Sequence, residues 1–181
     1  IALPATRIVS AAVVPAGAFA PVAAPLPANP APQAVRQAQE RAELFRSLPA
    51  FCRVTARVTT SPSSSITVET WLPAANWNGK FLVNGYAFYG NKLNPVPLAT
   101  VLRQGYATAT TDNGLPESST IFDGSFLRGN PEGVTDWGER AWHETVVKSK
   151  ALIAAYYGRP ATKSYFNGAG GAGRQGLKAV Q

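Results

Sequence analysis

The chain has 181 residues, 45 % of them hydrophobic and 10 % aromatic, a composition typical of one folded domain and unlike that of a disordered chain. The formal net charge is +7, but acidic residues are interleaved with the basic ones, which argues against a nucleic-acid-binding arm. One Cys and one His are too few for an internal disulfide or for most zinc sites.

Residues 1–32 are rich in Ala, Pro and Val, and we expect an extended arm with two short strands, at Ile8-Val9 and Val13-Val14. The weakly polar stretch 11–28 contains four prolines, which exclude a transmembrane helix, and it lacks the basic start of a signal peptide. Because the sequence contains no methionine, residue 1 is not an initiator. We therefore expect a processed product or a piece of a longer polypeptide.

Residues 33–48 predict a helix, because apolar residues recur there every three or four positions, and Pro49 ends it. Residues 51–60 and 66–72 alternate between apolar and polar side chains on either side of a serine-rich turn. This pattern predicts an antiparallel β-hairpin.

The rest of the chain alternates between the two kinds of element. In order, we expect a buried strand at 80–84, a helix at 98–104 ended by Gly105, a strand at 106–111, a loop at 115–131, a helix at 137–157, a strand at 164–167 and a helix from Arg174. Strands that alternate with helices predict an α/β fold, with parallel strands after the hairpin and helices on both faces. Asp112 follows a strand at its carboxyl end, and we expect it to form hydrogen bonds within a loop.

Residues 167–174 read Asn-Gly-Ala-Gly-Gly-Ala-Gly-Arg, between the last strand and the last helix. Gly168, Gly170 and Gly173 match the dinucleotide-binding pattern G-x-G-x-x-G, which presents backbone amides to a pyrophosphate. That pattern requires an acidic residue about 20 positions later, and the 8 residues after Gly173 contain none. The alternative is a nucleophile elbow, the sharp strand-to-helix turn of α/β-hydrolases. The small residues fit such a turn, but the serine is missing.

Further segments, spread over the whole chain, form one ordered pattern. They are 13–17 (VVPAG), 48–54 (LPAFCRV), 71–73 (WLP), 77–81 (WNGKF), 105–108 (GYAT), 111–112 (TD), 140–144 (RAWHE), 148–158, 164–168 (SYFNG) and 173–176 (GRQG). In these segments the chain resembles the tannase and feruloyl esterase family, and the resemblance extends from about Ile8 to Gln181. The resemblance implies a secreted or periplasmic serine esterase with an α/β-hydrolase core, which cleaves esters of aromatic acids such as gallate or ferulate.

The elbow departs from the family pattern, which reads Gly-Cys-Ser-Thr-Gly-Gly-Arg-Gln-Gly. Ala169 stands at the family's Cys and Gly170 at its nucleophilic Ser, while Gly171 and Ala172 replace the next Thr and Gly. A Ser-His-Asp mechanism needs an attacking hydroxyl, and the family's Asp and His lie downstream of the elbow. We therefore expect no intact catalytic residue and no ester hydrolysis by this chain alone.

The segment that resembles the family's oxyanion loop is altered as well. The family has Gly-Asn-Gly-Gly after the Lys-Phe strand, and residues 84–87 read Asn-Gly-Tyr-Ala here. The candidate backbone donors for an oxyanion are therefore those of Gly85, Tyr86 and Ala87. The rings of Tyr86, Phe88 and Tyr89 are candidates either to stack on an aromatic acid or to form part of the core.

On this resemblance, residues 1–32 are the N-terminal arm and 33–181 the N-terminal part of an α/β-hydrolase domain, cut after the elbow. The strand edge left there would be completed by another chain or by a missing C-terminal part. The family pairs the cysteine at the position of Cys52 with one near the mature N-terminus. We expect no cofactor, and no metal, because the family's calcium site belongs to a lid domain. Two hypotheses remain open: an inactive part of an aromatic-ester hydrolase, or a degenerate hydrolase that serves as a binding or structural subunit.

Overall fold

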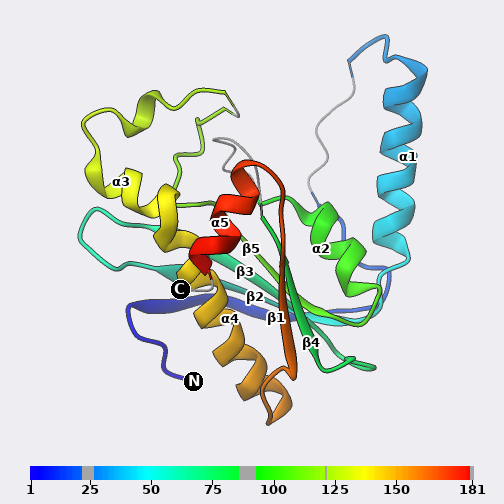
Figure 1. Cartoon of the computed structure of the whole chain (residues 1–181). Coiled ribbons are helices and arrows are strands. Elements are labelled where there is room, and N and C mark those ends of the chain that lie inside the picture. The colour runs from blue at the N-terminus through cyan, green and yellow to red at the C-terminus, as the bar shows by residue number, and fades with distance from the viewer. Residues whose placement is uncertain (22–26, 86–92, 121, 180–181) are drawn as a thin grey trace.

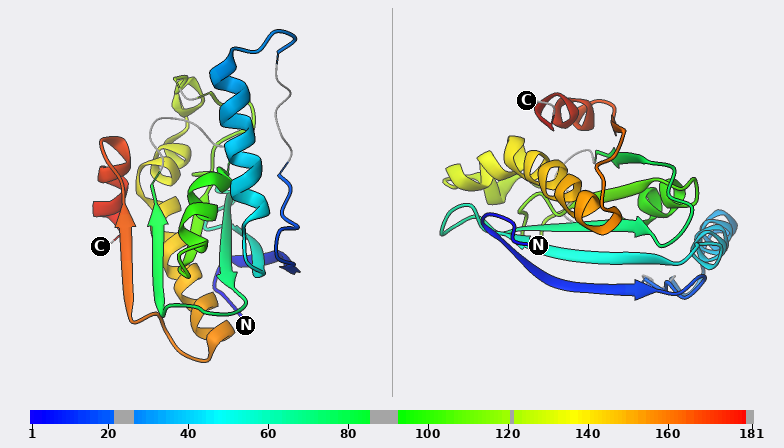
Figure 2. Two further views of the ribbon diagram at one scale, coloured as in Figure 1. Left: turned by 90° about the vertical axis from the view of Figure 1, so that its right-hand side faces the viewer. Right: turned by 90° about the horizontal axis from the view of Figure 1, so that it is seen from below.

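The computed structural model describes residues 1–21, 27–85, 93–120 and 122–179, and in these ranges the chain forms a six-stranded mixed sheet flanked by helices (Figures 1 and 2). The strands are β1 (Thr6–Val14), β2 (Phe51–Val58), β3 (Ile66–Pro73), β4 (Lys80–Asn84), β5 (Ala107–Thr111) and β6 (Lys163–Asn167). Their order across the sheet is β1-β2-β3-β5-β4-β6. The pairs from β1 to β5 are antiparallel, whereas β4 lies parallel to both β5 and β6. The predicted hairpin followed by parallel strands is confirmed.

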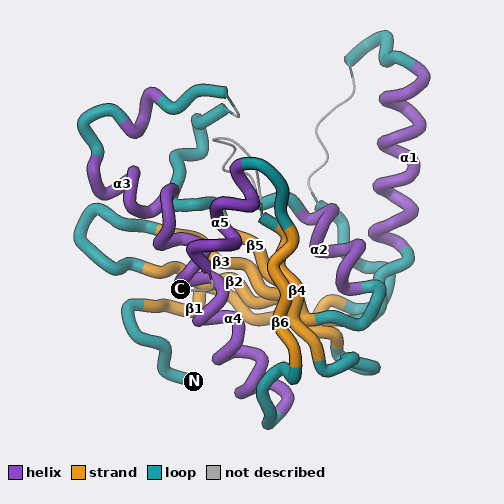
Figure 3. The backbone as a smooth tube through the Cα atoms, viewed as in Figure 1, coloured by secondary structure: helices purple, strands orange, loops and turns teal. Residues whose placement is uncertain are grey.

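The helices are α1 (Pro32–Arg46), α2 (Pro95–Leu102), α3 (Pro131–Thr135), α4 (Ala141–Tyr157) and α5 (Gly171–Ala179), with a 3₁₀ turn at Ser125–Leu127 and a π-helical segment at Asp136–Arg140 (Figure 3). Four expectations need correction. The helix predicted over 98–104 begins at Pro95 and ends at Leu102. Residues 6–14 form one strand, paired along its length with β2, and not two short strands. The last helix begins at Gly171 and not at Arg174. The first turn of the helix predicted over 137–157 is π-helical.

Successive side chains of β3 point to opposite faces of the sheet, and on each face they pack against helices. Trp71 and Phe51 pack with residues of α1 and α2, in a cluster completed by Phe19, Phe45, Leu48, Leu98, Ala99 and Leu102. Leu72 packs with Trp142 and Ile153 of α4, on the other face. The predicted coverage of both faces by helices is thus confirmed, and it explains why β3 is almost entirely buried.

A buried charge lies on the sheet face that α2 covers. The side chain of Glu69 is 4 % exposed and accepts two hydrogen bonds from the Arg53 guanidinium, from Nε to Oε1 at 3.0 Å and from Nη2 to Oε2 at 2.8 Å. The indole Nε1 of Trp71 donates a third bond to Oε1 at 2.6 Å. Bidentate, charge-assisted bonds of this kind compensate the loss of hydration of a buried carboxylate.

Strand β6 forms one edge of the described sheet. It pairs with β4 on one side, and four of its five residues are exposed, Tyr165 by 43 %. In the described ranges no helix is both long and apolar enough to cross a bilayer.

Candidate functional site

The glycine cluster forms the turn between β6 and α5 (Figure 1). Strand β6 ends at Asn167 and α5 begins at Gly171, so the turn consists of residues 168–170. Gly170 has a φ of +58°, in the left-handed region. The backbone N–H of Arg174 donates to the carbonyl of Gly170 at 3.2 Å and closes the first turn of the helix. The chain thus turns sharply from strand to helix, as is required of the predicted nucleophile elbow.

Close packing explains two of the glycines at this end of the sheet. A Cβ added to Gly168 would lie 2.7 Å from both the carbonyl carbon and the carbonyl oxygen of Ala172. A Cβ on Gly85 would lie 2.7 Å from the ring of Phe166. A Cβ on Gly170, in contrast, would meet no atom within 4 Å. Position 170 therefore has open space for a side chain, as a nucleophile requires, but carries none.

The parallel pairing of β4 and β6 brings the start of the predicted oxyanion loop beside the elbow. The N–H of Gly85 donates to the carbonyl of Asn167 at 2.9 Å, and the Asn167 side-chain amide donates to Oδ1 of Asn84 at 3.0 Å. The Gly85 N–H is thus directed at β6, so this predicted donor is already used within the sheet. Tyr86 and Ala87, together with Phe88 and Tyr89, lie outside the described residues.

Asp112 lies at the carboxyl end of β5 and forms one hydrogen bond in the loop that follows, as predicted, and another to the start of β3. Its Oδ1 accepts from the N–H of Thr67 at 2.8 Å and from the N–H of Gly114 at 2.9 Å. Burial raises the pKa of Asp112 above its ordinary value, although these hydrogen bonds oppose the shift. The residue after it, Asn113, is fully buried with a φ of +58°.

Replacement of Asp112 by Asn is expected to increase stability at pH 7. Both backbone bonds go to Oδ1, which an amide retains, whereas the charge that burial disfavours is removed. Because the pKa of Asp112 is higher in the folded state, the folded chain binds more protons between the two pKa values, and its stability falls as pH rises through that interval. In urea unfolding from about pH 3.5 to 7, the stability of the parent relative to Asp112→Asn should therefore fall as pH rises. If Asp112→Asn were less stable than the parent at pH 7, the conclusion that burial of the Asp112 charge is unfavourable would be wrong.

Metal ligands do not gather in the described ranges: no group of three His, Cys, Asp or Glu side chains is placed to hold an ion there. Sequence reasoning missed the contacts that hold the elbow helix. Arg174 of α5 contacts the π-helical segment through its guanidinium. In the sequence, only the segment 173–176 (GRQG), one of those that carry the family resemblance, singled out this arginine.

Comparisons with known proteins agree with this geometry. The family described as tannase and feruloyl esterase matches residues 52–181. An uncharacterized esterase of Xanthomonas campestris pv. campestris is 40 % identical over 181 residues, which are 100 % of this chain and 28 % of that protein. A probable feruloyl esterase B-1 of Aspergillus oryzae is 39 % identical over 132 residues, 73 % of this chain and 24 % of that protein. The chain thus spans about a quarter of the length of these relatives.

Solved structures show the same fold. The crystal structure of feruloyl esterase B from Aspergillus oryzae superposes with a TM-score of 0.76 at 33 % identity, over 100 % of this chain and 32 % of that one. Tannin acyl hydrolase from Aspergillus niger has a TM-score of 0.64 at 18 % identity over 98 % of this chain and 31 % of that one, which supports the fold alone. The chain belongs to the tannase and feruloyl esterase family and contains part of its α/β-hydrolase fold.

Proposed function

We propose that the polypeptide to which this sequence belongs binds esters of aromatic acids such as ferulate or gallate, and that the chain does not hydrolyse them. The binding part of the proposal rests on the family and on relatives that are named feruloyl esterases. The observation that carries the loss of hydrolysis is Gly170, which occupies the apex of the elbow with a φ of +58° and no side chain.

Acyl transfer by this family's mechanism begins with attack of a hydroxyl on the ester carbonyl. Residues 168–173 are glycines and alanines, so the turn supplies no hydroxyl or thiol. In serine proteases that lack the nucleophile, binding and the oxyanion hole alone leave an acceleration of roughly 10³–10⁴ over water. We therefore expect no larger acceleration over water from the part of the binding site that this chain contains.

The test is release of ferulate from methyl ferulate and of gallate from methyl gallate, followed by liquid chromatography. We expect the chain and Gly170→Ala to give the same rate, because neither has a nucleophile at the elbow. Hydrolysis by the chain that phenylmethylsulfonyl fluoride abolishes would overturn the proposal, because that reagent requires a reactive serine.

A second candidate function is a binding or structural subunit, outside the cytoplasm in a secreted or periplasmic location, as the family resemblance suggests. The feature that favours a partner is β6, whose outer edge pairs with no other described strand. Open strand edges recruit further strands. An intact mass of the native protein well above 19.1 kDa would assign that partner to the same polypeptide, and a mass near 19.1 kDa would assign it to a second chain.

A further inference from the structure

The π-helical segment Asp136–Arg140 lies between α3 and α4 and contacts the elbow helix α5. Arg174 of α5 donates from Nη1 to the carbonyl oxygen of Gly138. Its guanidinium also lies 4.5 Å from the centre of the Trp137 ring, within the range of a cation–π interaction. Single π-helical turns occur often at functional sites, because they displace backbone groups from the regular helical pattern. Here the Gly138 carbonyl accepts a side chain from a different helix.

The same arginine contacts the apex of the elbow through its backbone. The N–H of Arg174 donates to the carbonyl of Gly170 at 3.2 Å. One residue therefore joins position 170 to the π-helical segment, by a backbone bond on one side and a side-chain bond on the other. Nη2 of Arg174 is buried without a hydrogen-bond partner among the described residues. A buried unpaired N–H is unfavourable, so it offsets part of what the contacts with Gly138 and Trp137 contribute to stability.

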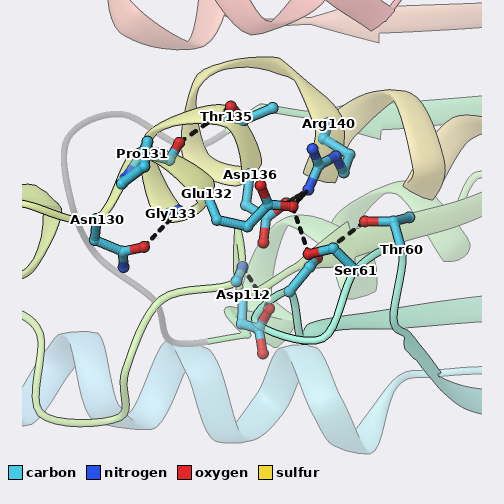
Figure 4. A network of polar contacts seen from close by, with 12 residues as sticks. Thr60, Ser61, Asp112, Asn130, Pro131, Glu132, Gly133, Thr135, Asp136 and Arg140 are labelled. Atoms are coloured by element: carbon cyan, nitrogen blue, oxygen red, sulfur yellow. Dashed lines mark hydrogen bonds and ion pairs between the residues drawn. The ribbon is translucent and has the colours of Figure 1, made fainter.

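The π-helical segment is itself held in place on its far side (Figure 4). Arg140 donates from Nη1 to Oδ1 of Asp136 at 2.7 Å and also to Oε1 of Glu132. Oε1 of Glu132 in turn accepts from the hydroxyl of Ser61 at 2.6 Å, in the turn between β2 and β3. Asp136 is 2 % exposed. Arg174 thus contacts a segment that is tied to the sheet, and not a mobile surface turn.

We propose that Arg174 is a positioning residue for the elbow. By holding α5 against Trp137 and Gly138, it sets the direction in which a side chain placed at position 170 would point. The inference rests on the proposed function only in taking residues 168–170 as the elbow, and it requires no hydrolysis by this chain. It predicts that a reactive group placed at position 170 responds to the geometry of the Arg174 side chain, and not only to its charge.

The test places a thiol at the elbow with Gly170→Cys, in a Cys52→Ser background that removes the only native cysteine. The thiol has open space, and the N-terminus of α5 is expected to lower its pKa below the ordinary value of about 8.5. Arg174→Lys retains the charge but loses the planar fork that both stacks and donates. We expect it to slow alkylation by iodoacetamide at pH 7 by at least about threefold, as the helix end turns away from the thiolate.

The matched control is Lys178→Gln, which removes the 3.3 Å ion pair with Glu139 between α5 and the same π-helical segment. It should leave the alkylation rate within about 1.5-fold, because this exposed pair is screened by solvent. A second readout, with Gly170 retained, is amide hydrogen exchange across 170–176. Arg174→Lys should accelerate it about tenfold, as expected for loss of a charged hydrogen bond, and Lys178→Gln should not.

Unchanged alkylation and unchanged exchange in Arg174→Lys would overturn the inference. So would a lowered melting temperature with both readouts at the parent value, because that result assigns Arg174 a purely structural role. If Gly170→Cys does not fold, the exchange measurement decides alone. Neither readout uses an ester, so hydrolysis of methyl ferulate by the chain would contradict the proposed function without affecting this result.

Discussion

Gly168→Ala is expected to lower the free energy of unfolding by about 3 kcal/mol, the upper part of the range for overpacking. The added methyl group would lie 2.7 Å from the carbonyl carbon and oxygen of Ala172, and no side-chain rotation can move backbone atoms of a helix. Relief requires that α5 shift away from the end of β6. The same shift would separate the elbow from Gly85. This glycine is also closely packed, because Phe166 and Ala172 occupy the space that a Cβ on it would need.

Gly173→Ala is the matched control, because it adds the same methyl group in the same short segment. Its Cβ would lie 3.5 Å from the Gly168 carbonyl oxygen, an ordinary contact. Inside a helix, alanine is favoured over glycine by about 1 kcal/mol, so this variant should be as stable as the parent or slightly more stable. Urea denaturation of the two variants measures the difference. If Gly168→Ala were as stable as Gly173→Ala, α5 would not pack on the elbow as described.

The strands could be located from the sequence because their signals are local. The apolar run of β4 predicted its observed bounds, 80–84, and the alternation in 51–60 and 66–72 predicted β2 and β3 to within two residues. Alternation predicts which side chains share a face, but it does not predict whether that face is covered. Glu69 therefore reads as a solvent-facing residue in the sequence, but it is buried on the face of β3 where Trp71 packs with Phe19 and α2.

The strand-to-helix turn at 168–170 was located by its small residues and by the resemblance, but the start of α5 was placed too late. Residues 171–173 are Gly-Ala-Gly, and the two glycines have a low intrinsic helix propensity. The helix forms there nonetheless, and Arg174, which also contacts Trp137 and Gly138, closes its first turn. The π-helical turn has no local signal of its own, since the apolar spacing after Trp137 is compatible with an ordinary α-helix.

Arg53→Met is expected to destabilise the chain by about 3 kcal/mol, because it leaves the Glu69 carboxylate buried with one remaining donor, Trp71 Nε1. The estimate is at the lower end of the range for a broken buried pair, since the Arg53 side chain is 43 % exposed while that of Glu69 is 4 % exposed. Thermal and urea unfolding measure the loss. It should appear without any change in the elbow, because the pair lies on β2 and β3.

Two further variants separate the charge from the loss of packing. Arg57 lies on the same strand, donates an exposed bond to Ser65 and acts on Asp112 through its charge without a direct ion pair. Arg57→Met should therefore change stability by less than about 1 kcal/mol, well below the loss expected for Arg53→Met. Addition of Glu69→Gln to Arg53→Met removes the unpaired charge and should restore most of the loss. Equal effects of Arg53→Met and Arg57→Met would show that Glu69 does not depend on Arg53. The expected difference assigns the arginine of the Phe-Cys-Arg-Val segment to the stability of the sheet that supports the elbow, and not to chemistry at the elbow.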